Sequence, residues 1–169
     1  MTATKQFLTL FGLVCVIIPC IVACDTEERT DQWQALTDIQ ALYNAIFAFR
    51  AEYGGFPYDG DLDRDMEIDL GRVVTILAGG TNSVARQVNA KGIHFVTPGQ
   101  QFRFQNGEVI DPWGGKFNLW VDGNRDGKIM LGGRERNVVF MIWSNGRNGT
   151  NEFCFGDDIS HDSQSHVPY

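Results

Sequence analysis

The apolar residues at the N-terminus form one uninterrupted run. Residues Phe7–Ala23 (FLTLFGLVCVIIPCIVA) contain no charged side chain in 17 positions, with Lys5 before them and Asp25 after them. A helix needs about 20 apolar residues to span a bilayer, and Pro19 would kink one. A basic residue followed by a short apolar run is typical of a signal peptide. We therefore predict that residues 1–23 are a signal peptide or a membrane anchor.

The end of this run resembles a lipoprotein processing site. Ile21-Val22-Ala23-Cys24 is similar to a bacterial lipobox, in which a small residue precedes a cysteine that is lipidated and becomes the new N-terminus. We predict lipidation at Cys24. An uncleaved membrane helix and an ordinary secreted protein remain the alternatives.

A second pattern, with helical spacing, follows the acidic residues after Cys24. Apolar side chains recur every three or four positions, at Leu36, Ile39, Tyr43, Ile46, Phe49 and Tyr53. Thr30 or Asp31 can cap the start of such a helix, and Gly54-Gly55 can end it. Residues 24–53 are thus predicted to be a linker and a long helix, whose first turns extend beyond the globular body.

Glycine separates this helix from the rest, because 18 of the 19 glycines lie between Gly54 and Gly156. Leu70, Val73, Val74 and Leu77 suit a short second helix that ends at Gly79-Gly80. Three segments suit strands, namely residues 93–96, 117–121 and 138–143. We expect the last two to pair as an antiparallel hairpin across the loop 122–137. Helices precede strands rather than alternate with them, so the fold class is α+β. The globular domain is assigned to residues 54–160 and a tail to residues 161–169.

The composition argues against two classes of function, nucleic-acid binding and catalysis. The 169 residues include 14 Lys and Arg against 21 Asp and Glu, a net charge of −7. This balance excludes the basic stripe of a nucleic-acid binder, so no nucleic-acid partner is expected. None of the three histidines stands with a Ser, Cys or second His at catalytic or ligand spacing. We therefore predict that the protein is not an enzyme.

One loop has the pattern of a calcium site. Residues 122–129 (DGNRDGKI) match the D-x-N-x-D-G-x-I core of calcium loops, which places oxygens of Asp122, Asn124 and Asp126 at alternate positions. The twelfth position is Gly133 instead of a bidentate Glu. The alternative is a hydrogen-bonded turn without metal, since turns favour the same residue types.

Two more motifs flank this loop. Residues 111–115 (DPWGG) precede it, and residues 144–149 (SNGRNG) follow it, with Asp157-Asp158-Ile159 downstream. Taken in order, the stretches LYNAIFAFRAEYGGFP, DPWGGKFNLWVDGNRDGKI and IWSNGRNGTNEFCFGDDIS resemble the G-type major pseudopilin of the type II secretion system, within the type IV pilin-like family. The resemblance covers most of residues 36–160.

The resemblance implies a pilin-like fold, with the long N-terminal helix packed on a small antiparallel sheet. It also implies a protein of the bacterial cell envelope, anchored in a membrane and facing the periplasm or exterior, with filament or secretion-system subunits as partners. Pseudopilins of this type bind calcium in the C-terminal loop. That site corresponds here to Asn148, where the family has Asp, and to Asp158. Asp157, Asp122 and Asp126 would complete it if the two loops meet.

The N-terminus departs from the family. A prepilin has Gly-Phe at its cleavage site and a Glu at the fifth mature position, whereas this chain has Gly12-Leu13 and Ile17. Two interpretations follow. The protein is a membrane-tethered, pseudopilin-like structural or accessory subunit stabilised by calcium, or it is an exported lipoprotein that uses a pilin-like fold as a binding module and does not polymerise.

Overall fold

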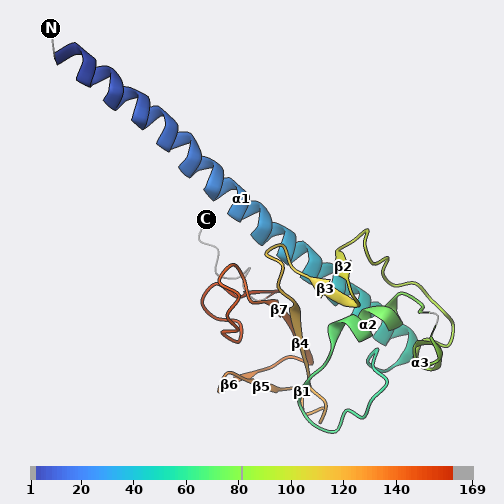
Figure 1. The fold of residues 1–169 in the computed structure, drawn as a ribbon. Helices are drawn as coiled ribbons and strands as arrows, with labels where there is room; N and C mark the ends of the chain where they lie inside the picture. Colours follow the sequence, from blue (N-terminus) through green and yellow to red (C-terminus); the bar gives the residue numbers. More distant parts are fainter. Residues whose placement is uncertain (1–2, 81, 162–169) are drawn as a thin grey trace.

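A long N-terminal helix dominates the structure, a computed structural model that describes residues 3–80 and 82–161. Helix α1 (Ala3–Tyr53) has 51 residues, and its N-terminal part projects away from the body (Figure 1). Side chains are described from residue 26 onward, except those of residues 81, 84 and 162–169. No helix in that part of the chain is long and apolar enough to cross a membrane.

The predicted start of the long helix was wrong. The helix passes through Thr30 and Asp31 without a break, and the Thr30 hydroxyl donates to the carbonyl of Thr26 within the helix (2.8 Å) instead of capping it. No glycine or proline separates Cys24 from Tyr53, so nothing in this segment stops the helix from propagating. The predicted end was correct, because Gly54 adopts a left-handed φ of 73° and its N–H donates to the Arg50 carbonyl (2.8 Å).

The C-terminal half of α1 packs on the body through one buried face. Its buried apolar residues recur at helical spacing, and they are Ala35, Ile39, Leu42, Ala45, Ile46 and Phe49. Helix α2 (Leu70–Leu77) matches the predicted second helix and is capped by Asp69, which accepts from the Gly71 N–H (2.9 Å). A third helix, α3 (Ser83–Val88), was not predicted because it has only 6 residues.

The main sheet has four antiparallel strands in the order β1-β4-β7-β8 (Figure 1). The central pair confirms the predicted hairpin. Strands β4 (Phe117–Val121) and β7 (Phe140–Ser144) pair from Phe117 with Ser144 to Val121 with Phe140, although β7 begins two residues later than predicted. The edge strands are short, β1 (Met66–Glu67) and β8 (Ile159–Ser160).

The predicted strand at residues 93–96 does not form. The Asn89 side chain, which is buried, accepts from the Ile93 N–H (3.0 Å) and donates to the Ile93 carbonyl (2.8 Å). The Phe95 N–H donates to the carbonyl of Leu77 (2.8 Å). This segment therefore satisfies its backbone with a side chain and a helix end instead of a neighbouring strand.

Two further hairpins complete the body. Strands β2 (Arg103–Gln105) and β3 (Glu108–Ile110) form one, and β5 (Ile129–Leu131) and β6 (Arg134–Arg136) form the other, inside the predicted loop 122–137. The hairpin β5–β6 builds a second core with β7, comprising Ile129, Leu131, Met141 and Trp143. Successive side chains of β7 point to opposite faces, so Phe140 and Ile142 enter the main core with α1. The fold is α+β, as predicted.

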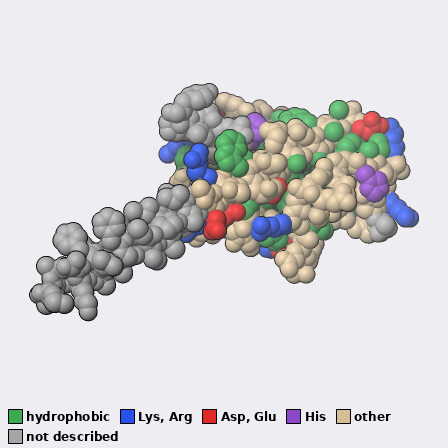
Figure 2. All heavy atoms as spheres, turned by 90° about the horizontal axis from the view of Figure 1, so that it is seen from above, with side chains coloured by type: hydrophobic (Ala, Val, Ile, Leu, Met, Phe, Trp, Pro, Cys, Tyr) green, Lys and Arg blue, Asp and Glu red, His purple; other side chains and the backbone are tan. Residues whose placement is uncertain are grey.

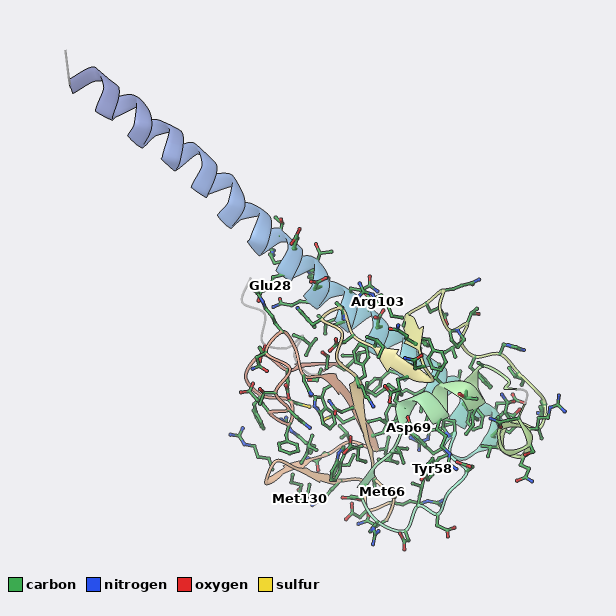
Figure 3. All side chains as sticks on the ribbon, in the orientation of Figure 1. Glu28, Tyr58, Met66, Asp69, Arg103 and Met130 are labelled. Atoms are coloured by element: carbon green, nitrogen blue, oxygen red, sulfur yellow. The ribbon has the colours of Figure 1, made fainter. Side chains whose placement is uncertain are left out.

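One carboxyl lies in the contact between α1 and the body. Asp38 is only 2% exposed, and its Oδ1 accepts from the Gln34 side chain (2.7 Å). Burial raises the pKa of Asp38, while the Gln34 hydrogen bond and the guanidinium of Arg103, which lies beside α1 (Figure 3), lower it less. The folded state therefore holds this proton more tightly than the unfolded state. Ionisation costs folding free energy that is absent at acid pH and develops as the pH rises through the folded pKa.

We predict that Asp38→Asn raises the melting temperature at neutral pH. Asn keeps an acceptor for Gln34 and removes the buried charge, so the gain should shrink as the pH falls to about 4 and vanish at lower pH, where the carboxyl is protonated in both states. Thermal melts across this pH range measure the effect. The exposed Asp61→Asn is the control for a mere reduction of net negative charge. A gain that is equal for both variants, or independent of pH, would contradict the prediction.

Candidate functional site

Asp111, the first residue of the DPWGG motif, joins it to the SNGRNG motif. Asp111 is fully buried, and its Oδ1 accepts from the N–H groups of Trp113 (3.0 Å) and Gly115 (2.7 Å). Its Oδ2 accepts from the Ser144 hydroxyl (2.5 Å), and the Ser144 oxygen accepts from the Gly146 N–H (3.0 Å). The two motifs, 33 residues apart between Asp111 and Ser144, therefore form one buried network at the start of the C-terminal loop.

The C-terminal loop, residues 145–158, is organised by two adjacent carboxylates. Asp157 Oδ2 accepts from the Asn148 N–H (3.0 Å), and Asp157 Oδ1 accepts from the Asn148 side chain. Asp158 Oδ2 accepts from the N–H groups of Glu152 (3.0 Å) and Cys154 (2.8 Å). Asp158 is 5% exposed, and its Oδ1 is buried with no hydrogen-bond partner among the described residues.

The backbone of this loop is tightly held. A Cβ at Gly146 would lie 2.2 Å from the carbonyl oxygen of Asp157, so only glycine fits there. Phe153 and Cys154 both adopt left-handed conformations, with φ of 56° and 67°. Such strain persists only where the surroundings enforce it. The two hydrogen bonds to Asp158 Oδ2 supply part of that constraint.

The surroundings of the Asp158 carboxyl oppose its ionisation. Burial raises the pKa of the Asp158 carboxyl most, the N–H donors of Cys154 and Glu152 lower it, and the carboxylates of Glu152 and Asp157 raise it again. The carboxylates therefore oppose one another in the folded protein. A divalent cation bound to Asp158 Oδ1 would give this oxygen a partner. It would also reduce the repulsion among the carboxylates of Asp158, Glu152 and Asp157.

The hairpin loop holds the other three predicted metal ligands, and their oxygens are occupied by backbone donors. Asp122 accepts from the N–H groups of Asp126 (3.2 Å) and Gly127 (2.8 Å). Asn124 accepts from the Asp126 N–H (2.9 Å), and Asp126 from the Lys128 N–H (2.9 Å). These are the bonds of the hydrogen-bonded turn that the sequence left open as the alternative.

The two loops do not bring the six predicted ligands together. Asp122 follows the end of β4 that pairs with Phe140, whereas the C-terminal loop follows Ser144 at the opposite end of the β4–β7 ladder. Within the described side chains, no three acidic, His or Cys residues are grouped to hold a metal. The two halves of the predicted site therefore lie at opposite ends of the β4–β7 ladder, and metal binding at either half stays a prediction.

The C-terminal loop contacts the β5–β6 hairpin, which follows the loop of Asp122 and Asp126, through aromatic side chains. A Cβ at Gly132 would lie 2.9 Å from the Phe153 Cβ, and the Arg134 guanidinium carbon lies 4.0 Å from the centre of the Phe155 ring. This contact attaches the C-terminal loop to the β5–β6 hairpin, from which Met130 projects outward, 55% exposed (Figure 3). Sequence reasoning missed it because β5–β6 was not predicted.

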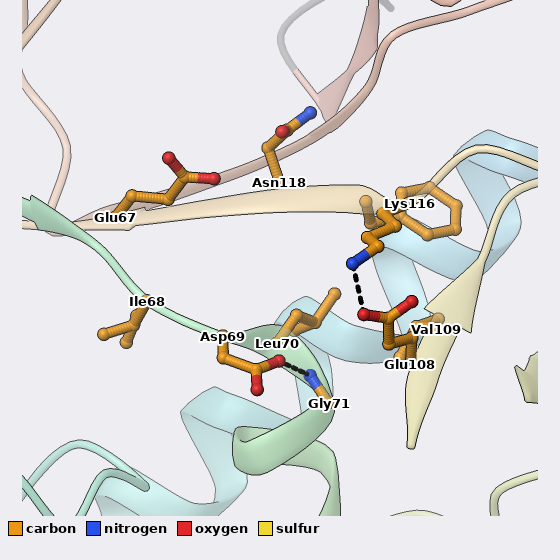
Figure 4. Close-up of a pocket in the computed structure, with 10 residues that line it drawn as sticks. Glu67, Ile68, Asp69, Leu70, Gly71, Glu108, Val109, Lys116 and Asn118 are labelled. Carbon is orange, nitrogen blue, oxygen red and sulfur yellow. Dashed lines mark hydrogen bonds and ion pairs between the residues drawn. The ribbon is translucent and has the colours of Figure 1, made fainter. Parts of the chain in front are cut away.

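A polar cavity that the sequence did not indicate lies elsewhere in the body. It has a volume of about 400 Å³ between β1, β4 and the β2–β3 hairpin, beside the start of α2 (Figure 4). Three of its polar side chains have structural partners, because Asp69 caps α2 and Lys116 pairs with Glu108. On the face shown in Figure 2, basic side chains are scattered rather than gathered into a stripe.

The remaining predicted residues are placed as follows. Cys24 and the apolar run before it lie outside the described side chains, so lipidation stays a prediction. His161 stacks on Tyr43 with ring centres 5.1 Å apart, and His94 lies against Gly79. The absence of catalysis also stays a prediction.

No protein-family model matches the sequence, and no curated protein matches it. Among solved structures, the chain is similar to the major pseudopilin from the type 2 secretion system of enterohaemorrhagic Escherichia coli. The sequence identity is 15%, the match covers 86% of this chain and 93% of that one, and the TM-score is 0.42.

The Asp111–Ser144 bond yields a stability prediction. Ser144→Ala leaves Asp111 Oδ2 and the Gly146 N–H buried without partners, which should cost about 1–3 kcal/mol of unfolding free energy. Urea denaturation monitored by tryptophan fluorescence measures the loss. Ser83→Ala, at an exposed serine at the start of α3, is the matched control and should change the free energy by less than about 0.5 kcal/mol. Equal effects of the two substitutions would show that the buried network adds nothing to stability.

Proposed function

We propose that the protein is a membrane-tethered, pilin-like structural or accessory subunit of a type II secretion system or a related filament. The observation that carries the proposal is the division of α1 into two parts. The C-terminal half packs on the antiparallel sheet, and the N-terminal half, which contains the apolar run of residues 7–23, projects beyond the body. This is the arrangement that the sequence motifs imply.

The projecting part has the length and composition of an anchor or an assembly helix. From Ala3 to Asp25 it extends about 35 Å at 1.5 Å per residue, and its sequence is uncharged from Phe7 to Ala23. An apolar helix of this length needs either lipid or neighbouring helices around it. A tethered subunit or a filament subunit meets that need.

The lipoprotein alternative differs in what remains of α1. Processing at Cys24 would remove the projecting apolar half and leave the rest of α1, with its buried face from Ala35 to Phe49, on a lipid anchor. Processing after Gly12 would instead keep most of the apolar helix. The two interpretations therefore predict different N-termini for the same folded body.

We predict that intact mass spectrometry of the native protein distinguishes them. For a filament subunit, the mass corresponds to a chain that begins at Leu13 with a methylated amine. For the lipoprotein, it corresponds to a chain that begins at Cys24 and carries acyl groups. The full-length chain as control fixes the mass of the unprocessed form. Acyl mass on Cys24 would overturn the filament interpretation.

Calcium is proposed as a stabilising ligand of the C-terminal loop. Calcium accepts carboxylate, amide and backbone carbonyl oxygens, and the buried, unpartnered Asp158 Oδ1 is the oxygen that supports the proposal. Asp157, Asn148 and Glu152 would have to exchange hydrogen bonds within the loop for the ion. In the hairpin loop, Asp122, Asn124 and Asp126 already accept backbone N–H groups, so calcium there stays the weaker prediction.

A two-by-two melting experiment tests the calcium proposal. Calcium should raise the melting temperature of the wild type by linkage and leave Asp158→Asn unchanged. Without calcium, at neutral pH, Asp158→Asn should be at least as stable as the wild type, because Asn removes the buried charge and keeps an acceptor for the N–H groups of Glu152 and Cys154.

Asp126→Asn is the matched control in the hairpin loop and should retain the calcium response. If calcium stabilises Asp158→Asn as much as the wild type, the C-terminal loop is not the site. If Asp126→Asn alone loses the response, the hairpin loop is.

A further inference from the structure

Two arginines from separate elements line one cavity of the body. The cavity has a volume of about 330 Å³ and lies between the end of α1 and the loop that joins β4 to β5. Arg50 belongs to the last turn of α1, and Arg125 belongs to the loop. Phe56 and Leu62, from the segment that follows α1 (Figure 1), supply apolar walls. The cavity thus combines two basic residues with apolar surface.

These two arginines have no partner within the described part of the chain. Neither side chain makes an ion pair, a hydrogen bond or a ring contact there. Carboxylates are abundant, since the chain has 21 Asp and Glu against 14 Lys and Arg. Other basic side chains do pair with them, namely Arg72, Lys91, Lys116, Lys128 and Arg147. Two unpaired arginines on one cavity therefore indicate a site for an anion from outside the chain.

Asp122, the acidic residue that lines this cavity, is occupied by its own loop. It is 8% exposed, and its oxygens accept from the N–H groups of Asp126 (3.2 Å) and Gly127 (2.8 Å). These bonds hold the loop in a conformation in which Arg125 has a left-handed φ of 61°. That conformation is uncommon for a residue other than Gly, Asn or Asp, and such strain clusters at ligand-binding sites. The loop therefore keeps Arg125 at the cavity despite the strain of its backbone.

Cavities on both sides extend this one into a groove. On one side it adjoins, at Val139, a cavity of about 300 Å³ beside Phe47, whose side chain is 50% exposed. On the other side it adjoins, at Phe56, a cavity of about 590 Å³ that is lined by Asp61 and Asp63. We call the three cavities together the arginine groove. Its elongated form, with aromatic, basic and acidic surface in succession, fits an extended peptide.

We infer that the arginine groove binds an extended peptide segment of a partner protein. An Asp or Glu of that segment lies between Arg50 and Arg125, and a neighbouring aromatic or large aliphatic side chain lies against Phe47. Guanidinium groups recognise carboxylates through paired N–H donors. The carboxylates of Asp61 and Asp63 repel a second acidic residue and so fix the direction of the segment. The inference holds for either form of the N-terminus.

A membrane surface does not fit this site. Arg50 lies about 40 Å along α1 from Ala23, where the apolar run ends, at 1.5 Å per residue. Both proposed forms of the N-terminus place the lipid at that distant end. Headgroup phosphates beside the anchor therefore do not reach Arg50. A nucleic acid is also excluded, because a chain of net charge −7 lacks the basic stripe that it needs.

Selection from a peptide library tests the inference. The full chain in detergent micelles is panned at low ionic strength, where exposed ion pairs are least screened, against random heptapeptides displayed on phage. We expect the selected peptides to share an Asp or Glu beside an aromatic or large aliphatic residue. The best peptide, synthesised with both ends capped, should bind Arg50→Gln and Arg125→Gln about tenfold or more weakly than the wild type.

The matched control is Arg86→Gln, which removes the same charge from an exposed arginine of α3 and should leave the affinity unchanged. A second measurement changes the peptide instead of the protein. Replacing its acidic residue by the corresponding amide should weaken binding to the wild type by a similar factor. The same replacement should have no effect on binding to the double variant of Arg50→Gln and Arg125→Gln, because the paired charges act as a unit.

Three results would overturn the inference. The first is a library that yields no binder or only binders without an acidic residue. The second is an equal loss of affinity in Arg86→Gln and in the two groove variants. The third is self-association of the full chain, measured by chemical crosslinking, that disappears in the double variant, since a second copy would then occupy the groove. None of these results bears on the N-terminal mass, which tests the proposed function separately.

Discussion

The buried carboxylate of Asp111 fixes the geometry of the C-terminal half of the body. A fully buried carboxylate is costly unless hydrogen bonds replace its hydration, and here two backbone N–H groups and the Ser144 hydroxyl do so. Ser144 is the last residue of β7 and pairs with Phe117, the first of β4. The bond therefore ties the turn before β4 to the end of β7. Gly146, which donates to the same hydroxyl, directs the C-terminal loop away from that point.

The register set at this end decides what each face of the sheet contacts. A shift of one residue would exchange the faces of β7 and place Met141 and Trp143 against α1. In the observed register these two residues instead cover the β5–β6 hairpin, and Cys154 of the C-terminal loop packs on the same small core. The loop with Asp158 is thus supported on one side by the Asp111 network and on the other by the second core. This support explains how the loop keeps two successive left-handed residues next to an unpartnered carboxylate oxygen.

The sequence predicted secondary structure best where a single hydrophobic pattern was clear. Helix α2 and strand β4 formed at the predicted residues, because a short amphipathic or alternating pattern lay between clear capping and turn residues. Residues 93–96 had a strand pattern, but whether they pair depends on Asn89, whose role is visible only in three dimensions. The candidate metal residues fall into two groups, one in each loop, because the members of each group are close in sequence. That the loops lie at opposite ends of β4–β7 follows from the ladder direction and length, which the spacing of the motifs does not contain.

The structure divides α1 into a projecting part and a part that packs on the body, so the nature of the anchor can be considered separately from the fold. The apolar run ends at Ala23, and among the described side chains the buried face of α1 begins at Ala35, so the anchor and the packed face occupy different parts of one helix. Processing at Cys24 would replace the apolar part with lipid and leave the packed face in place. Copies on lipid anchors would be held at one height by the membrane, whereas a retained apolar helix can shift along its neighbours as a filament extends. The nature of the N-terminus therefore decides whether the body can leave the membrane surface, while the contact between α1 and the sheet is the same in both forms.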